Sequence, residues 1–544
     1  MTAIPDQARF DYIIVGAGSA GCVLANRLTE SGRHRVLLIE AGGHDRHIWI
    51  HIPLGYGKLF DNAKVNWLYK TEPEPELNNR QIIQPRGKVL GGSSSINGLL
   101  YVRGQHEDYD HWRQLGNTGW GFAEVLPYFR RAEDQQRGAD EFHGTGGPLA
   151  VSDVCEPHPL CEAFIEAAQR AGIARNDDFN GASQEGAGYF QLTTKNGRRW
   201  STAVGYLRQA RRRRNLAIIS NALASRILFS GRRAVGVQYR QHGVPRTAFT
   251  DGEVIVSGGA FNSPQLLQLS GVGPAALLKS HGIDVVADAS GVGDDLNDHI
   301  SGRIMLRCKD TFTLNDAVRT WAGKLWHGSH YLLTRRGYLA IPAVSSAVFL
   351  RALPTSATPD SQCSISLFSA ANIGGELHPF PGVTGNCVLL RPESRGYVRI
   401  KSADPRQAPA INPNYLATQK DLDTVTAGVA AMRRIFQAPA MARYIAEEIE
   451  PGVQCDNDAE LLDFIRRRGS TTYHPVGTCR MGQDPKAVVD EHLRMRGFSG
   501  LRVVDASIMP AVVSGNTNAA TIMNAEKGAD MILDDIKGRL AAAA

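Results

Sequence analysis

A GxGxxG run and a carboxylate further along the chain could together bind a dinucleotide. The run consists of Gly16, Gly18 and Gly21, and the carboxylate is Glu40. Gly16 allows a tight turn, Gly18 lets the backbone approach a pyrophosphate, and Gly21 lets a helix pack closely on a strand. Glu40 can accept hydrogen bonds from both hydroxyls of an adenosine ribose, and its charge would repel the 2′-phosphate of NADP. The same turn and strand end supply three further expected contacts, Ser19, Ala20 and Ala41.

The segments around these glycines have the periodicity of the strand–helix–strand unit that such a site needs. Residues 12–15 form a short apolar run typical of a buried strand, and the apolar residues from 22 to 28 repeat at helical spacing. Residues 36–39 form a second apolar run that ends at Glu40. The pattern predicts a βαβ unit whose helix N-terminus faces the phosphates.

Composition excludes several classes of function. Of the 544 residues, 43% are apolar and 21% are charged, as is typical of a soluble globular protein of about two to four domains. The net charge of +6 is small, and the basic run at 211–214 lacks interleaved aromatics, so we expect a solvated helix face and no nucleic-acid partner. The eight cysteines form no CxxC pair and no Cys/His cluster, which indicates free thiols in a reducing compartment and no metal site.

The sequence carries no secretory-signal pattern and no apolar run of about 18 residues, so we expect a cytoplasmic chain that does not span a membrane. Its C-terminal segment contains four apolar residues beside two basic ones, and it could touch the inner membrane peripherally. An ordinary helix packed on the dinucleotide domain is the alternative. These residues are Ile532, Leu533, Ile536, Leu540, Lys537 and Arg539. The oligomeric state is left open.

Dinucleotide-domain signals stop and then return along the chain, which predicts a second domain inserted into the first. Strands are expected at 216–220, 225–229, 234–239 and 253–256, before a helix at 264–269. The pattern then changes to strands at 346–350 and 397–400 and an amphipathic helix at 419–436. A strand at 501–505 and a helix at 519–535 resume the first pattern.

The fold class expected from this order is α/β, a Rossmann-like dinucleotide-binding domain with an inserted, sheet-based α+β cap. The active site would lie at the junction of the two domains. The dinucleotide-binding domain is expected to comprise 8–155, 190–304 and 470–540, and the substrate-binding domain 156–189 and 305–469.

Five motifs, in order along almost the whole chain, resemble those of the glucose–methanol–choline (GMC) oxidoreductase family. They are RGKVLGGSSSING at 86–98, GAFNSPQLLQLSGVG at 259–273, GVGDDLNDH at 291–299, YHPVGTC at 473–479 and GNTNAAT at 515–521. Within the family the chain looks closest to bacterial choline-dehydrogenase-like and aliphatic-alcohol-dehydrogenase members. The resemblance implies bound FAD.

The resemblance also implies which residues line the flavin. Some family members attach FAD covalently through a histidine in the first signature, where this chain has Ile96, so we expect non-covalent FAD. The backbone amides of the first signature would stabilise the negative charge of the reduced flavin. The further residues expected at the cofactor are Arg86, Gly91, Gly92, Ser93, Asn97, Gly98, Ala224, Asp505 and Ala506.

The two C-terminal motifs resemble the catalytic pair of the family. Hydride transfer from an alcohol requires a base beside the hydroxyl, because a developing alkoxide is the better hydride donor. His474 is expected to be that base, since an imidazole titrates near neutrality. Asn518 is expected to orient the substrate oxygen, although a helix N-cap is an alternative role for it.

We therefore expect FAD-dependent oxidation of a primary alcohol to an aldehyde by hydride transfer to flavin N5, with electrons passed to a quinone-like acceptor. Ser345 lies near where related sequences often carry Glu, so an uncharged alcohol is favoured over choline, with Ser345 among the substrate contacts. The alternatives are an alcohol oxidase that makes hydrogen peroxide, a choline dehydrogenase, and a hydroxynitrile lyase that retains FAD.

Overall fold

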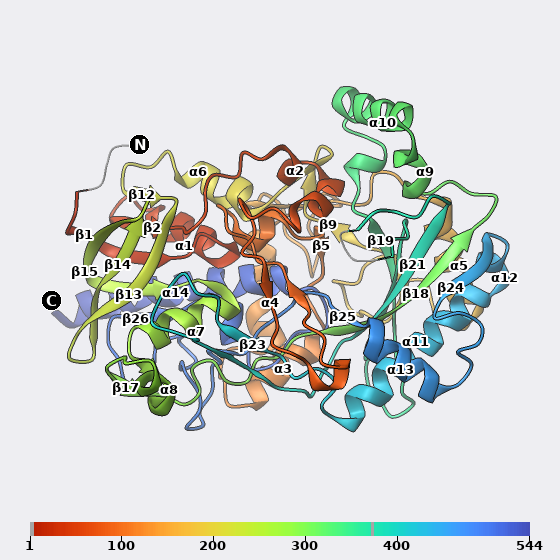
Figure 1. The fold of residues 1–544 in the computed structure, drawn as a ribbon. Coiled ribbons are helices and arrows are strands. Elements are labelled where there is room, and N and C mark those ends of the chain that lie inside the picture. Colours follow the sequence, from red (N-terminus) through yellow and green to blue (C-terminus); the bar gives the residue numbers. More distant parts are fainter. Residues whose placement is uncertain (1–4, 372–374, 544) are drawn as a thin grey trace.

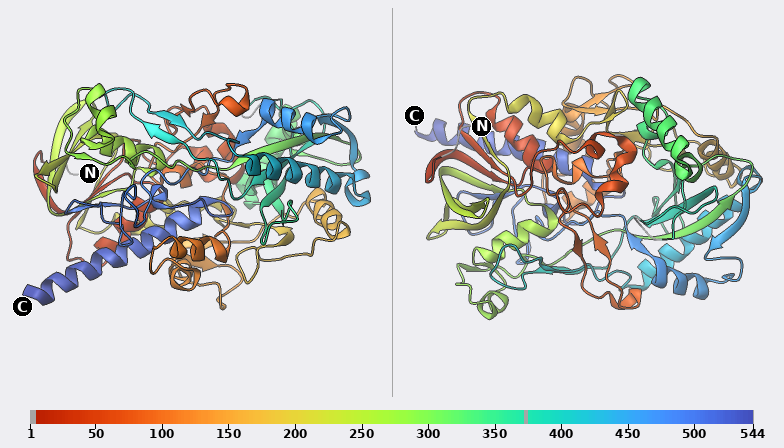
Figure 2. Two further views of the ribbon diagram at one scale, coloured as in Figure 1. Left: turned by 90° about the horizontal axis from the view of Figure 1, so that it is seen from below. Right: turned by 45° about the horizontal axis from the view of Figure 1, so that its top comes forward.

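Two sheets of seven strands each organise the chain and lie on opposite sides of the molecule in Figure 1. The computed structural model describes residues 5–371 and 375–543. Both ends of the described chain lie on the side of the first sheet (Figures 1 and 2). The predicted fold class, an α/β dinucleotide-binding domain with an inserted sheet-based domain, is confirmed.

The first sheet has the strand order β12-β2-β1-β15-β14-β13, and β26 pairs with β15. β1, β2, β12, β26 and the end of β15 run parallel, whereas β13, β14 and the start of β15 form an antiparallel meander. The strands are β1 (Ala8–Val15), β2 (Val36–Ile39), β12 (Leu216–Ile219), β13 (Ala222–Ser230), β14 (Arg233–Gln241), β15 (Val244–Val256) and β26 (Leu501–Val503). β1 and β2 are buried along most of their length, as expected for parallel strands covered on both faces.

Three helices pack around this sheet. α1 (Ser19–Thr29) starts at the glycine run and packs along α14 (Thr517–Ala543), and α7 (Gly259–Leu269) follows β15. α7 begins at Gly259, five residues before the predicted start, with Pro264 inside it. The glycine-rich stretch up to residue 150 also contains α3 (His106–Gln114) and α4 (Phe122–Ala132), which the sequence reading did not predict.

The second sheet is entirely antiparallel and has the order β24-β18-β21-β20-β19-β8, with β25 paired to β18. Its strands are β8 (Gly186–Tyr189), β18 (Ile300–Cys308), β19 (Val344–Leu350), β20 (Ser361–Ser366), β21 (Gly382–Leu389), β24 (Ile445–Glu450) and β25 (Ser470–Thr471). The strand expected at 397–400 is β22 (Tyr397–Arg399), which pairs only with β23 (Ala410–Asn412) in a separate ribbon. The exact domain boundaries stay a prediction.

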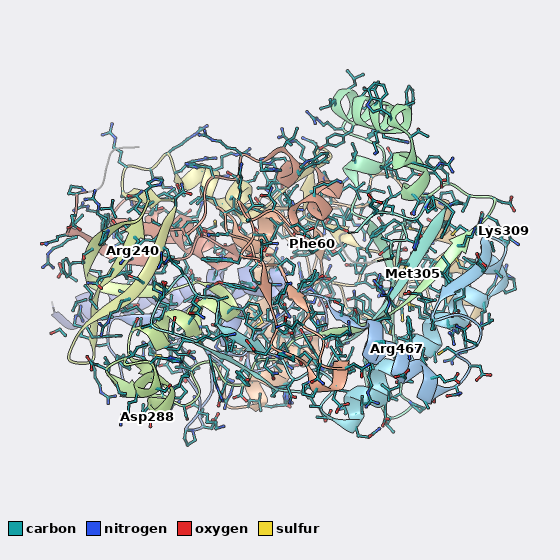
Figure 3. The ribbon with its side chains drawn as sticks, in the orientation of Figure 1. Phe60, Arg240, Asp288, Met305, Lys309 and Arg467 are labelled. Carbon is teal, nitrogen blue, oxygen red and sulfur yellow. The ribbon has the colours of Figure 1, made fainter. Side chains whose placement is uncertain are left out.

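The two faces of the second sheet have different roles because neighbouring strand residues point to opposite sides. α11 (Gln419–Gln437) covers one face, where a Cβ on Gly385 would lie 2.4 Å from the ring of Phe436. The other face looks toward the first sheet across the centre of the molecule. Figure 3 labels Phe60 there, between Arg240 of β14 and Met305 of β18. The remaining helices of this half are α5 (Pro159–Arg170), α9 (Leu314–Arg319), α10 (Trp321–Thr334), α12 (Pro439–Ala442) and α13 (Asp458–Arg468).

The C-terminal helix packs on the first domain along its described apolar residues. Ile532 is fully buried, and Met531 and Leu533 pack against the same core. The side chains of Ile536, Arg539 and Leu540 lie outside the described part of the chain. The described residues therefore favour the packed helix and give no support to a membrane contact here. Within the described ranges, no helix is both long and apolar enough to cross a membrane.

The eight cysteines are all free thiols, and seven of them are buried. Burial raises the pKa of the Cys22 thiol to about 12, so it stays protonated at neutral pH. The basic run at 211–214 occupies a turn after α6 (Arg208–Ala210) rather than the predicted helix face. Arg213 of this turn donates to Asn26 O and Thr29 Oγ1 of α1.

Candidate active site

A cavity of about 1590 Å³ lies between the two sheets. It exceeds the ~300–1,000 Å³ of a single small-molecule site, so it can hold a dinucleotide and a second molecule. Sixteen of the nineteen predicted site residues line it. They are Gly16, Gly18, Ser19, Ala20, Glu40, Ala41, Arg86, Gly92, Ser93, Asn97, Gly98, Ala224, His474, Asp505, Ala506 and Asn518, whereas Gly21, Gly91 and Ser345 do not line it.

Two glycine loops meet at the dinucleotide end of the cavity. Gly92 has φ +52°, and a Cβ there would lie 2.6 Å from the Cα of Gly18. Gly21 faces the strand instead, where a Cβ would lie 1.8 Å from the carbonyl oxygen of Gly16. Gly91 donates its backbone N–H to Ala17 O at 2.8 Å and so ties one loop to the other. The two glycines outside the lining therefore have structural roles. Gly21 allows the close packing of α1 on the first loop, and Gly91 bonds the second loop to the first.

Glu40 stands at the end of β2 with its carboxylate in the cavity wall. Its two oxygens accept the backbone N–H groups of Ala17 and Gly42 at 2.9 and 2.8 Å. Burial raises the pKa of this carboxyl to about 7, although both backbone hydrogen bonds oppose that rise. A carboxylate oxygen has two lone pairs, so each remains able to accept a ribose hydroxyl.

Asp505 follows β26, at the same edge of the first sheet as Glu40, and also lines the cavity. One oxygen of its carboxylate accepts hydrogen bonds from Ser263 Oγ at 2.6 Å and from the backbone N–H of Gly259 at 2.8 Å. The other oxygen accepts from the backbone N–H of Ser507. Asp505 thereby fixes the start of α7 against the strand that ends beside it.

The loop that carries Asn97 is held by a buried cation. Arg199 donates to Asn97 Oδ1 and O, both at 2.6 Å, and to Ser94 O at 3.1 Å. It also donates from Nε to Ile50 O at 2.7 Å, so its hydrogen-bond partners among the described residues are all uncharged oxygens. Burial lowers the pKa of Arg199 to about 9. The cation leaves a positive field behind the loop that faces the cavity.

His474 is brought to the cavity by a short strand pair at the edge of the second sheet. β25 ends at Thr471 and pairs with the first residues of β18, with Ile300 opposite Thr471. His299 precedes one strand and His474 follows the other, so the pairing brings the two rings together. One oxygen of Asp298 accepts the backbone N–H groups of His299 and His474 at 2.9 and 2.8 Å.

The hydrogen-bond chain around His474 fixes which ring nitrogen carries its proton. His299 Nε2 lies 3.0 Å from Leu390 O, and a carbonyl only accepts, so this Nε2 is protonated. A neutral His299 therefore accepts at Nδ1, which lies 2.9 Å from Nδ1 of His474. His474 must donate from Nδ1, which leaves the lone pair of its Nε2 as a hydrogen-bond acceptor. This lone pair can take a proton, as a general base must.

Both rings are held in their neutral forms. Burial lowers the pKa of His299 to about 4, even though Asp298 opposes the shift. The pKa of His474 lies well below its usual range because of burial, with smaller contributions from His299 and from the positive charge of Arg86. The pKa of His474 is therefore lower than the near-neutral value that the sequence led us to expect.

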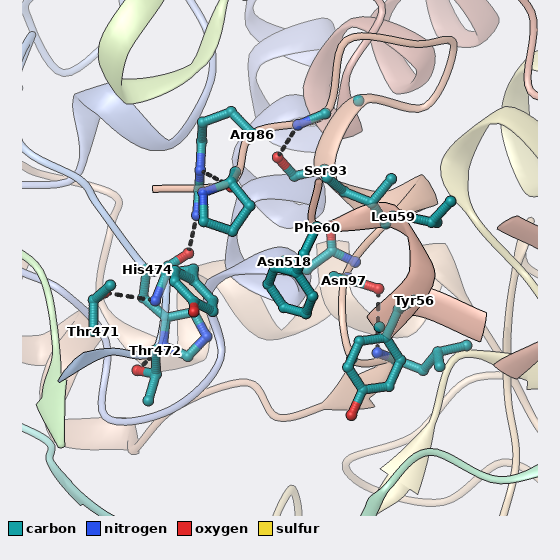
Figure 4. Close-up of a pocket in the computed structure, with 18 of the residues that line it drawn as sticks. Tyr56, Leu59, Phe60, Arg86, Ser93, Asn97, Thr471, Thr472, His474 and Asn518 are labelled. Atoms are coloured by element: carbon teal, nitrogen blue, oxygen red, sulfur yellow. Dashed lines mark hydrogen bonds between the residues drawn. The ribbon is translucent and has the colours of Figure 1, made fainter. Parts of the chain in front are cut away.

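Arg86 also shapes the loop before His474. It donates to Tyr473 O at 2.6 Å, and Tyr473 has the left-handed φ of +69°. Such a backbone in a large residue is strained and needs external support. Figure 4 shows Arg86 above His474, with Tyr56 and Leu59 across the cavity.

The two asparagines of the last motif have separate surroundings. Asn516 Nδ2 lies 3.0 Å from His474 Nε2 and donates to it. The buried Oδ1 of Asn516 has no hydrogen-bond partner among the described residues. Asn518 is one residue into α14, and its Oδ1 accepts from Ser19 Oγ at 2.7 Å, beside the glycine turn. Asn516, which the sequence reading missed, is thus the amide that contacts His474.

The substrate end of the cavity is walled by the second sheet. Its lining residues are Ser301, Arg303, Gln362, Ser364, Ser366, Thr384, Asn386 and Val388. They are mostly neutral and polar, and they include one cation and no carboxylate. The carboxylates elsewhere in the described lining are Glu40, Asp61, Glu376 and Asp505.

Ser345 does not join this wall. It is buried, and its hydroxyl lies 3.4 Å from Pro342 O, whereas the neighbouring Val344 lines the cavity. The register of β19 against β20 shifts between Val344 and Ser346, which breaks the simple alternation along the strand. The structure gives no support for Ser345 as a substrate contact.

Three comparisons with known proteins agree with this arrangement. The family model described as GMC oxidoreductase matches residues 10–301, and its C-terminal counterpart matches residues 392–525. An "Alcohol dehydrogenase [acceptor]" of Pseudomonas putida is 45% identical over 96% of both chains. An "Oxygen-dependent choline dehydrogenase" of Vibrio vulnificus is 43% identical over 97% of this chain and 95% of its own length. The crystal structure of a pyridoxine 4-oxidase from "Mesorbium loti" has a TM-score of 0.88 and 31% identity, and covers 96% of this chain and 98% of that one.

Proposed function

Because the chain belongs to the GMC oxidoreductase family, whose members use FAD to oxidise alcohol-type substrates, we propose that it oxidises a neutral primary alcohol to the aldehyde. We further propose that His474 is the base, that FAD is bound non-covalently, and that a quinone-like molecule accepts the electrons. The fixed tautomer of His474 is the observation that carries the proposal.

The residues of the cavity fit FAD. Gly16, Gly18 and Gly92 line the cavity without side chains near the start of α1, so a pyrophosphate could approach the backbone there. Glu40 lines the cavity at the end of β2, where it could bind a ribose. Ile96 lines the cavity and cannot form a covalent bond to a flavin, which supports non-covalent binding. When bound, FAD supplies the two-electron acceptor for the hydride.

The proton and the hydride leave the alcohol on different routes. Asn516 Nδ2 donates to His474 Nε2, and a bound alcohol hydroxyl would replace it there. The lone pair on Nε2 would then take the hydroxyl proton, and the released Asn516 Nδ2 could donate to the substrate oxygen. The C–H hydrogen leaves with its electron pair, and a C=O double bond forms. His299 keeps His474 Nδ1 protonated, so the proton can enter only at Nε2.

Neutral alcohols are favoured over choline on electrostatic grounds. Recognition of a quaternary ammonium needs a carboxylate or an aromatic box, and the sheet wall of the substrate end offers Arg303 and neutral groups instead. Choline dehydrogenases match this chain about as well as the alcohol dehydrogenase does, so choline is the second candidate.

Anaerobic stopped-flow measurements of flavin bleaching test the proposal. The panel consists of straight-chain primary alcohols of increasing length, benzyl alcohol and choline, followed by reoxidation with a soluble quinone analogue or with air. We expect bleaching by neutral alcohols at higher kcat/KM than by choline, and faster reoxidation by the quinone. A highest kcat/KM for choline would overturn the substrate, and rapid peroxide formation in air would establish an oxidase instead.

Acid precipitation tests the mode of FAD binding. We expect yellow protein that releases all of its FAD into the supernatant. Flavin that stays with the pellet would show a covalent link.

A further inference from the structure

Helix α10 (Trp321–Thr334) presents its apolar side chains to the outside. Surface helices normally bury that face and expose the polar one. Here the exposed fraction is 77% for Trp321, 69% for Trp326 and 86% for Leu333, and Leu325 and Leu332 are also more than half exposed. Figure 1 shows α10 standing out from the body above β19, and the right-hand view of Figure 2 again places it at the edge of the molecule.

The inverted orientation of α10 is fixed by its other side. Tyr331 is buried against Ile52 and Ala340, and its hydroxyl donates to Gly197 O at 2.9 Å. The guanidinium of Arg335 lies 5.1 Å from the ring of Tyr331. Rotation of the helix to bury its tryptophans would expose Tyr331 and break this hydrogen bond.

The helix and its ends are basic. No Asp or Glu occurs between residues 317 and 337, whereas Arg319, Lys324, Arg335 and Arg336 all fall within that segment. Arg319, Lys324 and Arg336 are exposed. The charged residues of the segment itself are thus all basic, and Glu156 approaches it at Gly337, whose backbone N–H donates to Glu156 Oε1 at 3.4 Å.

This face adjoins the rim of the active-site cavity. Lys324, His327 and Gly328 of α10 line the cavity, as do Val318 and Arg319 at the end of α9. The outward residues Trp326 and Leu333 do not line it. A surface that covers the apolar face would therefore lie next to the cavity.

We propose that α10 docks the protein on an anionic lipid bilayer. Tryptophans beside Lys and Arg suit the headgroup boundary, where the rings meet acyl chains and the cations meet anionic phosphates. A second copy of the chain is the less favourable occupant, because two copies of this helix face to face would bring like charges together. Docking would hold the cavity beside the phase in which apolar alcohols and quinones concentrate.

Flotation with lipid vesicles tests the docking surface. The probes are vesicles of phosphatidylcholine alone and of phosphatidylcholine with phosphatidylglycerol, and the protein is the full FAD-loaded chain. The test variant is the double substitution Trp326→Ser and Leu333→Ser, and Arg336→Gln probes the charge. The matched control is Leu115→Ser with Val453→Ser, two exposed apolar residues away from α10.

We expect wild type to float with the phosphatidylglycerol vesicles and less with phosphatidylcholine alone. The double variant should partition roughly tenfold or more weakly, the Arg336 variant should lose part of its preference for the anionic vesicles, and the control should behave as wild type. Absence of wild-type flotation, or equal flotation of the double variant, would overturn the proposal. A double variant that changes from dimer to monomer in light scattering, with unchanged flotation, would assign the face to self-association instead.

The result is separable from the proposed function. Reduction of the flavin by a water-soluble alcohol in vesicle-free buffer should be the same in wild type, the double variant and the control. Flotation with unimpaired solution activity concerns docking alone, whereas failure of every alcohol to reduce the flavin concerns the chemistry alone.

Discussion

The Nδ1 atoms of His474 and His299 lie 2.9 Å apart, and only one of them can carry the proton between them. The neutral ring of His299 carries its proton on Nε2, which donates to Leu390 O. The proton between the two Nδ1 atoms is therefore bonded to His474. Thr472 Oγ1, 3.1 Å from the same Nδ1, is a second acceptor for it. His299 does not itself line the cavity, and it is thus a positioning residue that prepares His474 Nε2 as a base.

Loss of the base should slow the chemistry and leave the cofactor in place. For His474→Ala we expect flavin reduction to fall by about 10²–10⁴, the usual value of a positioned general base, with FAD content unchanged. His492→Ala is the control, because His492 is exposed and does not line the cavity. Stopped-flow reduction with one alcohol gives the rates, and a near wild-type rate for His474→Ala would place the base elsewhere.

The acid limb of the pH profile should lie well below pH 6.5 in wild type. His474 acts as a base only when neutral, so activity is lost as pH falls through its pKa, which is depressed. His299→Ala removes one cause of that depression and admits solvent, so we expect the limb to move to higher pH and the rate to fall. His299→Asn, whose amide oxygen can still accept from His474, should restore part of both. Profiles of kcat/KM from pH 4.5 to 8 (roughly the working range of histidine) decide this, and superimposable profiles would contradict the role of His299.

Acid should also destabilise the fold through the same pair. His299 has a folded-state pKa of about 4 against an ordinary 6.5, so the unfolded chain binds the additional proton as pH falls from 6.5. The stability is present above pH 6.5 and is lost progressively down to pH 4, by about 3 kcal/mol. We expect Tm of wild type to fall over this range more steeply than Tm of His299→Asn. Parallel curves would mean that His299 is not buried in its neutral form.

The two asparagines of the last motif should separate by phenotype. Asn516→Ala removes the amide on His474 Nε2, so flavin reduction should slow while FAD stays bound. Asn518→Ala removes the acceptor of Ser19 at the glycine turn, so FAD binding should weaken with little change in the reduction rate of loaded enzyme. FAD content and single-turnover rates measured on both variants test the assignment, and the opposite pairing of effects would restore Asn518 as the catalytic amide.

Contact between the two glycine loops should be needed for FAD. A Cβ at Gly92 would clash with Gly18 and would require a left-handed backbone, so Gly92→Ala should lose most of its flavin. Gly231→Ala is the control, because Gly231 also has a left-handed backbone, with φ +58°, a Cβ there meets nothing within 4 Å, and it does not line the cavity. Flavin absorbance per protein checks the result, and full occupancy in Gly92→Ala would show that the loops can separate.

The sequence predicted the dinucleotide unit well because its signals are local. The strand at 36–39 has the predicted bounds, and Glu40 follows it into the cavity wall, since an apolar run and a glycine turn act over a few residues. His299 could not be predicted in this way. It meets His474 across 175 residues through the β18–β25 pair, and strands this short leave little periodicity to detect.

Side-chain direction was the second limit of the sequence reading. Asn516 and Asn518 belong to one tripeptide, and which of them faces His474 depends on where α14 begins, at Thr517. Ser345 was chosen by its position near a strand start, but a register shift in β19 decides which neighbouring residue lines the cavity. In both cases the residue that the structure places at the site lies one or two positions from the predicted one, and the predicted roles of Asn518 and Ser345 stay predictions.

One oxygen of Asp298 accepts the backbone N–H groups of both His299 and His474. The two segments that carry these histidines therefore cannot be replaced independently of each other. A chimaera with a single crossover between residues 299 and 471 would take the 298–299 segment from one relative and the 471–474 segment from another. Unless both segments come from the same parent, the hybrid can keep both hydrophobic cores and all cofactor-binding residues and still lack an oriented base. Exchange of segments between family members is therefore more constrained at residues 298–299 and 471–474 than in either hydrophobic core.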